Sequence, residues 1–304
     1  MKLLQNLRNN DKKAYVLLYT LLFCLLASLV FFWFFWDWRS LIWINDGADQ
    51  HFIALMYYGR MLREWVSGIF QGQGFAFPLY DFAIGQGDDV ITTLHYYCLG
   101  DPLALFFAFC PEQYTEYLYN FLVILRFYLM GLSFSAFCFY QKKEGSHTLL
   151  GAFLYAFCGF ALIGAIKHPF FLNPLIYLPL LCLAIEKVLR KESRKLFIAM
   201  TALCAMSNFY FFYMLTVLAV LYALVRFGCM YLPEVGWSFG KLKQWQKERK
   251  RAKKQAERQA LAKTSKKARV IKEKKSKERQ EKSEWLLAFI EIVPRGIGAY
   301  LTGV

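Results

Sequence analysis

The feature that most constrains this chain is a long apolar run near its start. Residues 14–36 contain no charged side chain and end in a cluster of phenylalanine and tryptophan. A helix of this length crosses the roughly 30 Å hydrocarbon core of a bilayer, and aromatic side chains gather where such a helix leaves it. A signal peptide has a shorter apolar core followed by small residues at a cleavage site. The run therefore predicts an uncleaved first transmembrane helix.

Composition indicates a membrane protein with several such helices. The chain is 57% hydrophobic and 19% aromatic, with a mean hydropathy of +0.30, which is too apolar for a soluble domain of this size. Its eight cysteines show no Cys-x-x-Cys spacing and do not cluster with histidines as in a zinc site. They indicate neither a zinc site nor a disulfide framework.

The formal net charge of +15 comes mainly from one segment. Residues 241–284 hold 19 of the 37 lysines and arginines but only 6 of the 22 acids. Few aromatic side chains are interleaved with these charges, unlike in a nucleic-acid-binding segment. We therefore expect a cytoplasmic segment that lies on anionic membrane lipids, with no nucleic-acid partner.

Later apolar runs predict further spans, and basic residues predict their direction. Lysine and arginine before residue 14 place the N-terminus in the cytoplasm, so the acidic loop after the first span is outside. The next three spans are expected at 117–140, 148–166 and 170–188. Residues 196–227 have basic flanks on both sides but are too few for two full spans. We therefore predict a hairpin of two short helices that turns at Ser207-Asn208.

The predicted fold class is an all-α polytopic integral membrane protein with an extracytoplasmic first loop. Within that loop, residues 50–70 repeat apolar side chains at a helical period, which is typical of an amphipathic helix in the membrane interface. Residues 99–110 are apolar but too short to cross. The expected segments are a cytoplasmic start (1–13), a first transmembrane helix (14–36), the outer loop (37–116), further transmembrane helices (117–236), a basic cytoplasmic segment (237–284) and the start of another span (285–304), where we expect the chain to be truncated.

The acids of the outer loop are the leading candidates for chemistry. Asp46 follows the first span by about ten residues and could act as a general base, but it could equally be the N-cap of the next helix. Asp88 and Asp89 follow two glycines and could bind a substrate hydroxyl or a metal, or could only form a turn. Asp49 and Gln50, beside Asp46, are expected to contact the substrate.

Polar side chains within or beside the later spans are candidates for binding phosphate or sugar. Arg126 lies near the middle of a span, where a charge costs about 2.5 to 3.5 kcal/mol and normally faces a polar interior or an anion. Arg126 and Lys167 are the best predicted partners for a lipid phosphate. His168 and Asn173 could contact a phosphate or a sugar, although a lone interfacial histidine is more often only solvated. Asn208, in a wholly apolar stretch, completes the predicted substrate-binding set.

No nucleotide-binding or hydrolase motif is present, and the residues indicate no cofactor or metal-ligand set. An enzyme whose site faces outwards has no supply of ATP or nucleotide sugars there. A transferase at this place would need a donor that is carried across the membrane on a lipid.

Several weak motifs occur in order along the chain. Asn45-Asp46-Gly47-x-x-Gln50 stands after the first span, and Gly85-x-Gly87-Asp88 leads to Tyr96-Tyr97 and Asp101-Pro102. His168-x-x-Phe171-x-Asn173 with Pro179, and the run from Ser207 to Met214, come later. In this order the motifs resemble the N-terminal part of the bacterial YfhO-type membrane proteins, over most of residues 14–230.

This resemblance implies a GT-C-like helix bundle that acts as a glycosyltransferase in the bacterial cell membrane. Such an enzyme takes a sugar from a polyprenyl-phosphate donor and attaches it, on the outer face, to an envelope polymer such as lipoteichoic acid. The resemblance favours Asp46 as the catalytic residue, and we predict that Asp88 assists it. Family members are much longer, so the chain is expected to cover part of one. The alternatives are a transporter or flippase of a lipid-linked intermediate and a non-catalytic scaffold.

Overall fold

The structure, a computed structural model, describes residues 12–72, 74–235, 298 and 303, which are mostly helical. Five helical segments of this part are long and apolar enough to cross a membrane: Lys12–Trp36, Glu112–Tyr140, Ser146–Lys167, Pro169–Leu189 and Phe209–Met230. The chain is therefore an all-α polytopic membrane protein, as predicted. The predicted basic segment 237–284 lies outside the described residues, as does nearly all of 285–304.

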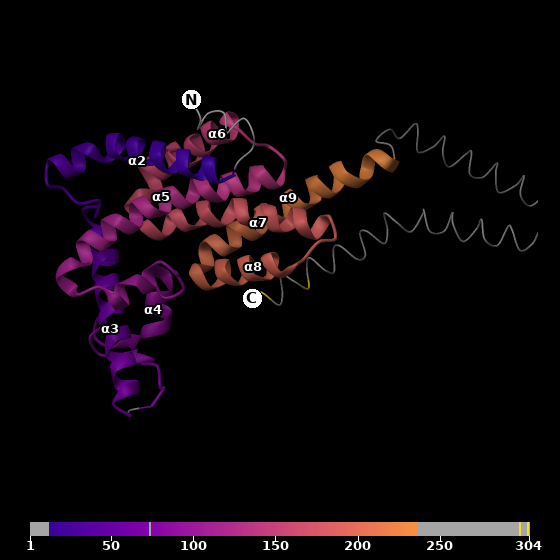
Figure 1. Ribbon diagram of the computed structural model, residues 1–304. Coiled ribbons are helices and arrows are strands. Elements are labelled where there is room, and N and C mark those ends of the chain that lie inside the picture. Colours follow the sequence, from indigo (N-terminus) through magenta and orange to yellow (C-terminus); the bar gives the residue numbers. More distant parts are fainter. Residues whose placement is uncertain (1–11, 73, 236–297, 299–302, 304) are drawn as a thin grey trace, which may run out of the picture.

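The helices of the bundle begin and end near the residues that hydropathy indicates. They are α2 (Lys12–Trp36), α5 (Thr115–Tyr140), α6 (Ser146–Ala156), α7 (Asn173–Leu189), α8 (Lys195–Ser207) and α9 (Phe209–Val235). Figure 1 shows α5 and α7 side by side in the middle of the bundle, with α2 along one side and α8 and α9 along the other. The apolar core lies between these helices.

Short helical segments extend some of the spans and break the chain at His168. η3 (Glu112–Tyr114) leads into α5, η4 (Phe160–Gly164) and η5 (Ala165–Lys167) follow α6, and η6 (Pro169–Leu172) leads into α7. His168 lies between η5 and η6 with an extended backbone, at φ −127° and ψ 92°. The residue before a proline avoids the helical region, so Pro169 accounts for the break.

The α8–α9 hairpin turns at Asn208, as the sequence predicts, but its two helices differ in length. α8 has 13 residues and is about 20 Å long at 1.5 Å per residue, which is too short to cross the membrane alone. α9 has 27 residues. The expectation of two short helices is therefore wrong for the second one, which continues beyond residue 227.

The chain between α2 and α5 forms a layer at one end of the bundle, called here the loop end (Figure 1). Its elements are η1 (Gly47–Phe52), α3 (Ile53–Phe70), β1 (Tyr80–Asp81), β2 (Asp88–Asp89), α4 (Val90–Tyr97) and η2 (Ala104–Phe109). The two short strands pair antiparallel, with Tyr80 opposite Asp89 and Asp81 opposite Asp88. α3 runs across the end of the bundle rather than along it.

The apolar face of α3 is covered by the chain itself. A Cβ atom at Gly59 would lie 2.6 Å from the carbonyl oxygen of Phe107, so only glycine allows η2 to approach this closely. Arg63 Nη1 donates hydrogen bonds to the carbonyls of Phe107 and Cys110, at 2.9 and 2.7 Å. The two apolar stretches of this layer, which the sequence predicts as an interfacial helix and a separate short piece, therefore pack on each other.

Candidate functional site

Asp46 lies at the loop end, in the turn that leads from α2 into η1. It occupies the N-cap position of η1, but its side chain makes no hydrogen bond to a backbone N–H there. Its Oδ1 instead accepts a hydrogen bond from Gln50 Nε2 at 3.2 Å, and the side chain is 52% exposed. Of the two roles that the sequence leaves open, capping is not observed. The carboxylate keeps acceptor sites that a ligand can reach.

The residues around Asp46 explain how the turn forms. Asn45 has a φ of 74°, a left-handed conformation that asparagine adopts more readily than most residues. A Cβ atom at Gly47 would lie 3.0 Å from the Cβ atom of Trp43, so a larger residue would crowd the turn. The Asn-Asp-Gly sequence thus directs the chain into η1 with the Asp46 carboxylate at its start.

Two histidines continue the polar row that begins at Asp46. His168 Nε2 lies 3.9 Å from Asp46 Oδ2, and His168 Nδ1 is hydrogen-bonded to His51 Nε2 at 2.7 Å. His51 is only 3% exposed, and its ring packs against those of Tyr97 and Phe170, with centroids at 5.5 and 5.0 Å. A carboxylate and two imidazoles therefore lie in sequence from the surface inwards.

The buried end of this row is uncharged at neutral pH. Burial and, to a smaller extent, the neighbouring His168 lower the pKa of His51 to about 4, against an opposing effect of Asp46. A neutral imidazole has one donor and one acceptor nitrogen, so His51 can either donate to His168 or accept from it. The Nδ1 atom of His51 is buried without a hydrogen-bond partner among the described residues.

A second set of hydrogen bonds connects Asp46 to α4. Gln50 donates to Asp46, and its Oε1 accepts a hydrogen bond from the Tyr97 hydroxyl at 2.9 Å. Burial raises the pKa of Tyr97, so its hydroxyl stays protonated and remains a donor at neutral pH. These contacts fix the Gln50 amide with its N–H towards Asp46.

Lys167 places a cation next to the Asp46 turn. Its Nζ lies over the ring of Trp43, 4.4 Å from the centroid, and cation–π contacts of this kind hold a flexible lysine in place. Trp43 accepts, through its carbonyl oxygen, the backbone N–H of Ala48. Lys167 directly precedes His168, so the chain that brings His168 to Asp46 also brings Lys167 to the turn that holds Trp43.

Asp88 and Asp89, on strand β2, lie away from the Asp46 turn. Asp89 is the N-cap of α4, where its side chain accepts from the backbone N–H groups of Ile91 and Thr92 and from the Thr92 hydroxyl. Asp88 is exposed, and its Oδ1 accepts the N–H of Asp89 at 2.7 Å. α4 has 8 residues, so this turn lies about 12 Å from the Tyr97 end of the helix. The observed contacts are those of a turn and a helix cap.

Arg126 is not open to a lipid. It is 4% exposed and forms a buried ion pair with Asp101, while its Nε donates to Asn173 Oδ1 at 2.9 Å. Its Nη1 also donates to the carbonyl of Leu122. The phosphate-binding roles predicted for Arg126 and Asn173 therefore gain no support from these contacts, because the charge of the arginine is already balanced inside the bundle.

The last two predicted residues, Asn208 and Asp49, have different surroundings. Asn208 is buried, donates to the carbonyl of Tyr96 at 3.2 Å and accepts the N–H of Phe211. It thereby caps α9 and connects the α8–α9 turn to α4. Asp49 is exposed on η1, and its backbone N–H donates to the Asn45 carbonyl.

The structure thus brings together Asp46, Gln50, Lys167 and His168 from the predicted set and adds His51 and Tyr97. Tyr97 belongs to the Tyr-Tyr pair that the sequence already singles out, and His51 directly follows Gln50, the last residue of the Asn45–Gln50 motif. Their pairing across 117 residues with His168 and across 47 with Gln50 is not visible in the sequence. Within the described ranges, no three His, Cys, Asp or Glu side chains are grouped as metal ligands.

Together, the fold and the site define a polytopic α-helical membrane protein with an acid–histidine centre at the loop end. Comparison with known proteins gives the family. The model of the bacterial membrane protein YfhO family matches residues 20–266, and the chain belongs to that family. No curated protein and no solved structure matches the chain.

Proposed function

We propose that this protein is a membrane glycosyltransferase that moves a sugar from a polyprenyl-phosphate donor to an envelope polymer. The observation that carries the proposal is the Asp46 carboxylate, which is half exposed and lies 3.9 Å from His168. An exposed carboxylate without a backbone partner can accept a proton from an acceptor hydroxyl. Lys167, the neighbour of His168, adds the cation that an anionic donor requires.

The distribution of basic residues supports a loop end that faces outwards. The opposite end of the bundle carries the basic residues of four helix ends: Lys12, Lys13, Lys142, Lys143, Arg190, Lys191, Arg194 and Lys195. There α2 and α8 begin and α5 and α7 end (Figure 1). Because basic residues gather on the cytoplasmic side, Asp46 would face the outside of the bacterial cell membrane, where lipid-linked sugars and the envelope polymer meet.

The proposed reaction is a direct displacement at the anomeric carbon of the donor sugar. Asp46 takes the proton of the acceptor hydroxyl, whose oxygen forms the new bond to that carbon. The bond between the carbon and the phosphate oxygen breaks, and its electron pair leaves with the polyprenyl phosphate. Lys167 and His168 stabilise the departing phosphate by donating hydrogen bonds, and Asp46 later releases its proton to water.

The remaining polar residues of the centre would position these groups. Gln50, fixed by Tyr97, orients the Asp46 carboxylate, and His51 orients the ring of His168. Asp49 stays a predicted acceptor contact because it is exposed on the same short helix. We leave Asp88 and Asp89 out of the reaction, since they form a turn and a cap at the far end of α4.

The transporter alternative would use charges within the spans and broken helices, and Arg126 with the 196–227 hairpin fits it in part. Arg126 is paired with Asp101 and Asn173 inside the bundle, so it offers no free charge to a moving substrate. The scaffold alternative depends on the basic segment 237–284, which lies outside the described residues.

The experiment uses cells that lack the gene, complemented with wild type, Asp46→Asn or Asp89→Asn at equal membrane abundance. Asp89→Asn is the matched control, since it removes an acid from the same loop and asparagine is an equally good N-cap. Mass spectrometry of the envelope polymer reads the sugar substitution. We expect wild type and Asp89→Asn to restore the sugar and Asp46→Asn not to. Equal restoration by Asp46→Asn would refute the mechanism, and no change with any variant would favour transport or scaffolding.

A further inference from the structure

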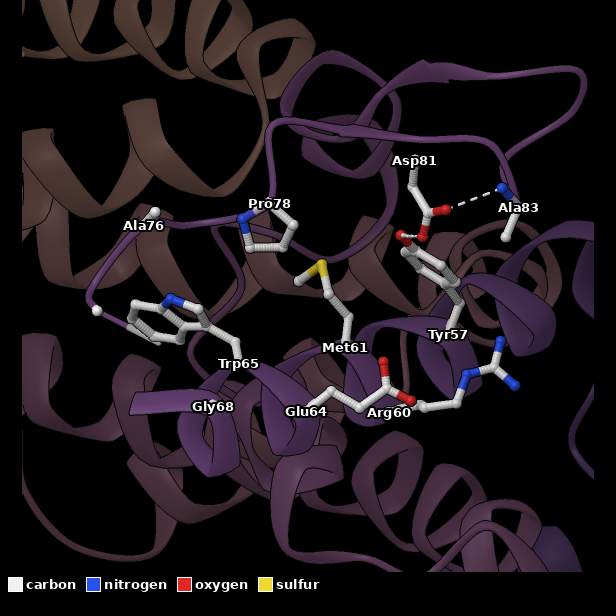
Figure 2. Close-up of a pocket in the computed structure, with 11 residues that line it drawn as sticks. Tyr57, Arg60, Met61, Glu64, Trp65, Gly68, Ala76, Pro78, Asp81 and Ala83 are labelled. Atoms are coloured by element: carbon white, nitrogen blue, oxygen red, sulfur yellow. Dashed lines mark hydrogen bonds between the residues drawn. The ribbon is translucent and has the colours of Figure 1, made fainter. Parts of the chain in front are cut away.

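A cavity of about 410 Å³ opens in the loop-end layer between α3 and the chain that follows it. In Figure 2, Trp65 stands at one end of the cavity and Tyr57 with Asp81 at the other, with Met61 between them. Neither Asp46 nor the two histidines of the candidate site line it. Its volume is within the range of small-molecule sites, about 300 to 1,000 Å³.

Asp81 offers a fixed acceptor at the cavity wall. Its Oδ2 accepts the Tyr57 hydroxyl at 2.6 Å, and its Oδ1 accepts the backbone N–H of Ala83 at 2.9 Å. These two hydrogen bonds lower the pKa of Asp81, which is therefore ionised at neutral pH. Each carboxylate oxygen retains a lone pair for a further donor.

α3 adds a donor and a second acceptor to the same wall. Arg60 and Glu64 are four residues apart, so both lie on the face of α3 that borders the cavity. Within the described residues, the ion pair of Arg60 is with Glu112 at 3.9 Å, and both side chains are about half exposed. With Asp81, the cavity has one cation and two anions and is net negative.

Trp65 forms an aromatic wall of the cavity, and its indole N–H donates to no described residue. Its ring packs edge-on against Phe77, with centroids 5.4 Å apart. Its Nε1 is buried, and no described residue accepts a hydrogen bond from it. Buried donors are nearly always satisfied in native proteins, and Trp65 is one of the residues that line the cavity.

We propose that this cavity binds a neutral sugar residue, as a carbohydrate subsite separate from the Asp46 centre. Sugar hydroxyls donate to Asp81 and Glu64 and accept from Arg60, while the ring of Trp65 covers the apolar face of the sugar. The net negative charge disfavours phosphate or an anionic sugar. The inference goes beyond the proposed function, since binding here requires no reaction at Asp46.

The test measures binding directly, with the full chain in lipid nanodiscs. Saturation-transfer NMR uses methyl β-D-glucopyranoside as the neutral probe and glycerol 3-phosphate as the anionic one. The variants are Trp65→Ala and Glu64→Gln, the latter at an exposed residue where the fold is not at risk. Trp38→Ala, at a tryptophan that is 96% exposed, is the matched control. Asp46→Asn separates this cavity from the proposed transfer centre.

We expect glucoside binding that weakens about ten-fold in Trp65→Ala and Glu64→Gln and is unchanged in Trp38→Ala and Asp46→Asn. Equal binding by wild type and both cavity variants would overturn the inference, as would no glucoside binding or stronger binding of glycerol 3-phosphate. Loss only in Asp46→Asn would also overturn it and would place the sugar at the transfer centre. Failure of the complementation experiment leaves this result unaffected, so the two proposals fail separately.

Discussion

Two aspartates of the loop-end layer stand at the starts of helices, and their side chains make different contacts. Asp89 has an extended backbone, at φ −70° and ψ 123°, and its side chain accepts the free N–H groups of α4. Asp46 holds the same position before η1, but its backbone is helical, at φ −52° and ψ −35°, and it caps nothing. An N-cap side chain reaches the first turn only from a non-helical backbone, so the backbone decides which acid is available.

The difference shows how to recognise a functional acid in a chain rich in candidates. The Asp89 carboxylate is occupied by three donors from its own helix, and that of Asp101 by Arg126 and the Leu103 N–H. Asp46 accepts only from another side chain, Gln50, and faces an imidazole. Of these three acids, Asp46 is the one whose carboxylate is held by neither a backbone N–H nor an arginine, so it is the one free to react.

Replacing Asp46 by asparagine is the change with the largest expected effect on this comparison. A positioned general base contributes about 10²- to 10⁴-fold to a rate, so Asp46→Asn should lower sugar transfer by that factor. Its melting temperature should stay that of the wild type, because no backbone hydrogen bond is lost. Transfer is measured in membranes with a polyprenyl-phosphate sugar. A large fall in stability would instead show that Asp46 supports the fold.

The fold could be predicted from the sequence to a greater extent than the site. Apolar runs have a length set by the bilayer, so the helices and the Ser207-Asn208 turn can be placed from hydropathy alone. The end of α9 could not, because its aromatic and aliphatic residues continue past the point where a second span of the hairpin was expected to stop. The packing of η2 on α3 could not be predicted either, because the sequence of an apolar helix face is the same whether lipid or protein covers it.

Site residues were harder to predict because each polar side chain had two possible partners. Arg126 in mid-span indicates a polar partner, but the sequence does not distinguish an anionic lipid from Asp101, 25 residues earlier. His168 looks like a lone interfacial histidine until the fold brings His51 within 2.7 Å. These long-range pairs depend on how the loop-end layer packs on the helix bundle, and local sequence patterns do not predict that packing.

Breaking the Arg126–Asp101 pair should have the next largest effect. It tests whether Asp101, unlike Asp46, serves the stability of the fold. Removing one partner of a buried ion pair leaves an unbalanced charge and costs about 3 to 5 kcal/mol. Arg126→Gln should therefore lower the free energy of unfolding by that amount, as measured by thermal or denaturant unfolding in detergent. A double variant, Arg126→Met with Asp101→Leu, should recover much of the loss. If Arg126→Gln unfolds like wild type but loses lipid-phosphate binding, the arginine is a ligand after all.

Acidification tests whether His51, the buried histidine next to His168, is held neutral in the folded protein. The pKa of His51 is about 4 in the folded protein and near 6.5 when unfolded, so the unfolded chain binds the proton more tightly. The stability that depends on neutral His51 is fully present above pH 6.5. As the pH falls from 6.5 to 4, protonation of His51 in the unfolded chain lowers the free energy of unfolding by about 3 kcal/mol. Unfolding measured across this range should be less pH-dependent in His51→Gln than in wild type. Identical pH profiles would show that His51 is not held neutral in the folded state.

The smallest expected effect is at Asp89, the aspartate that caps a helix in the comparison with Asp46. Asp89→Ala removes the cap of α4 and should loosen that helix, which raises the rate of hydrogen exchange at the backbone amides of Val90–Tyr97. Asp89→Asn keeps a capping oxygen and should exchange like wild type. Because Tyr97 holds Gln50 from the far end of α4, sugar transfer by Asp89→Ala should fall only slightly. A loss of transfer in Asp89→Asn with unchanged exchange would make Asp89 a reacting acid and would remove the distinction drawn between it and Asp46.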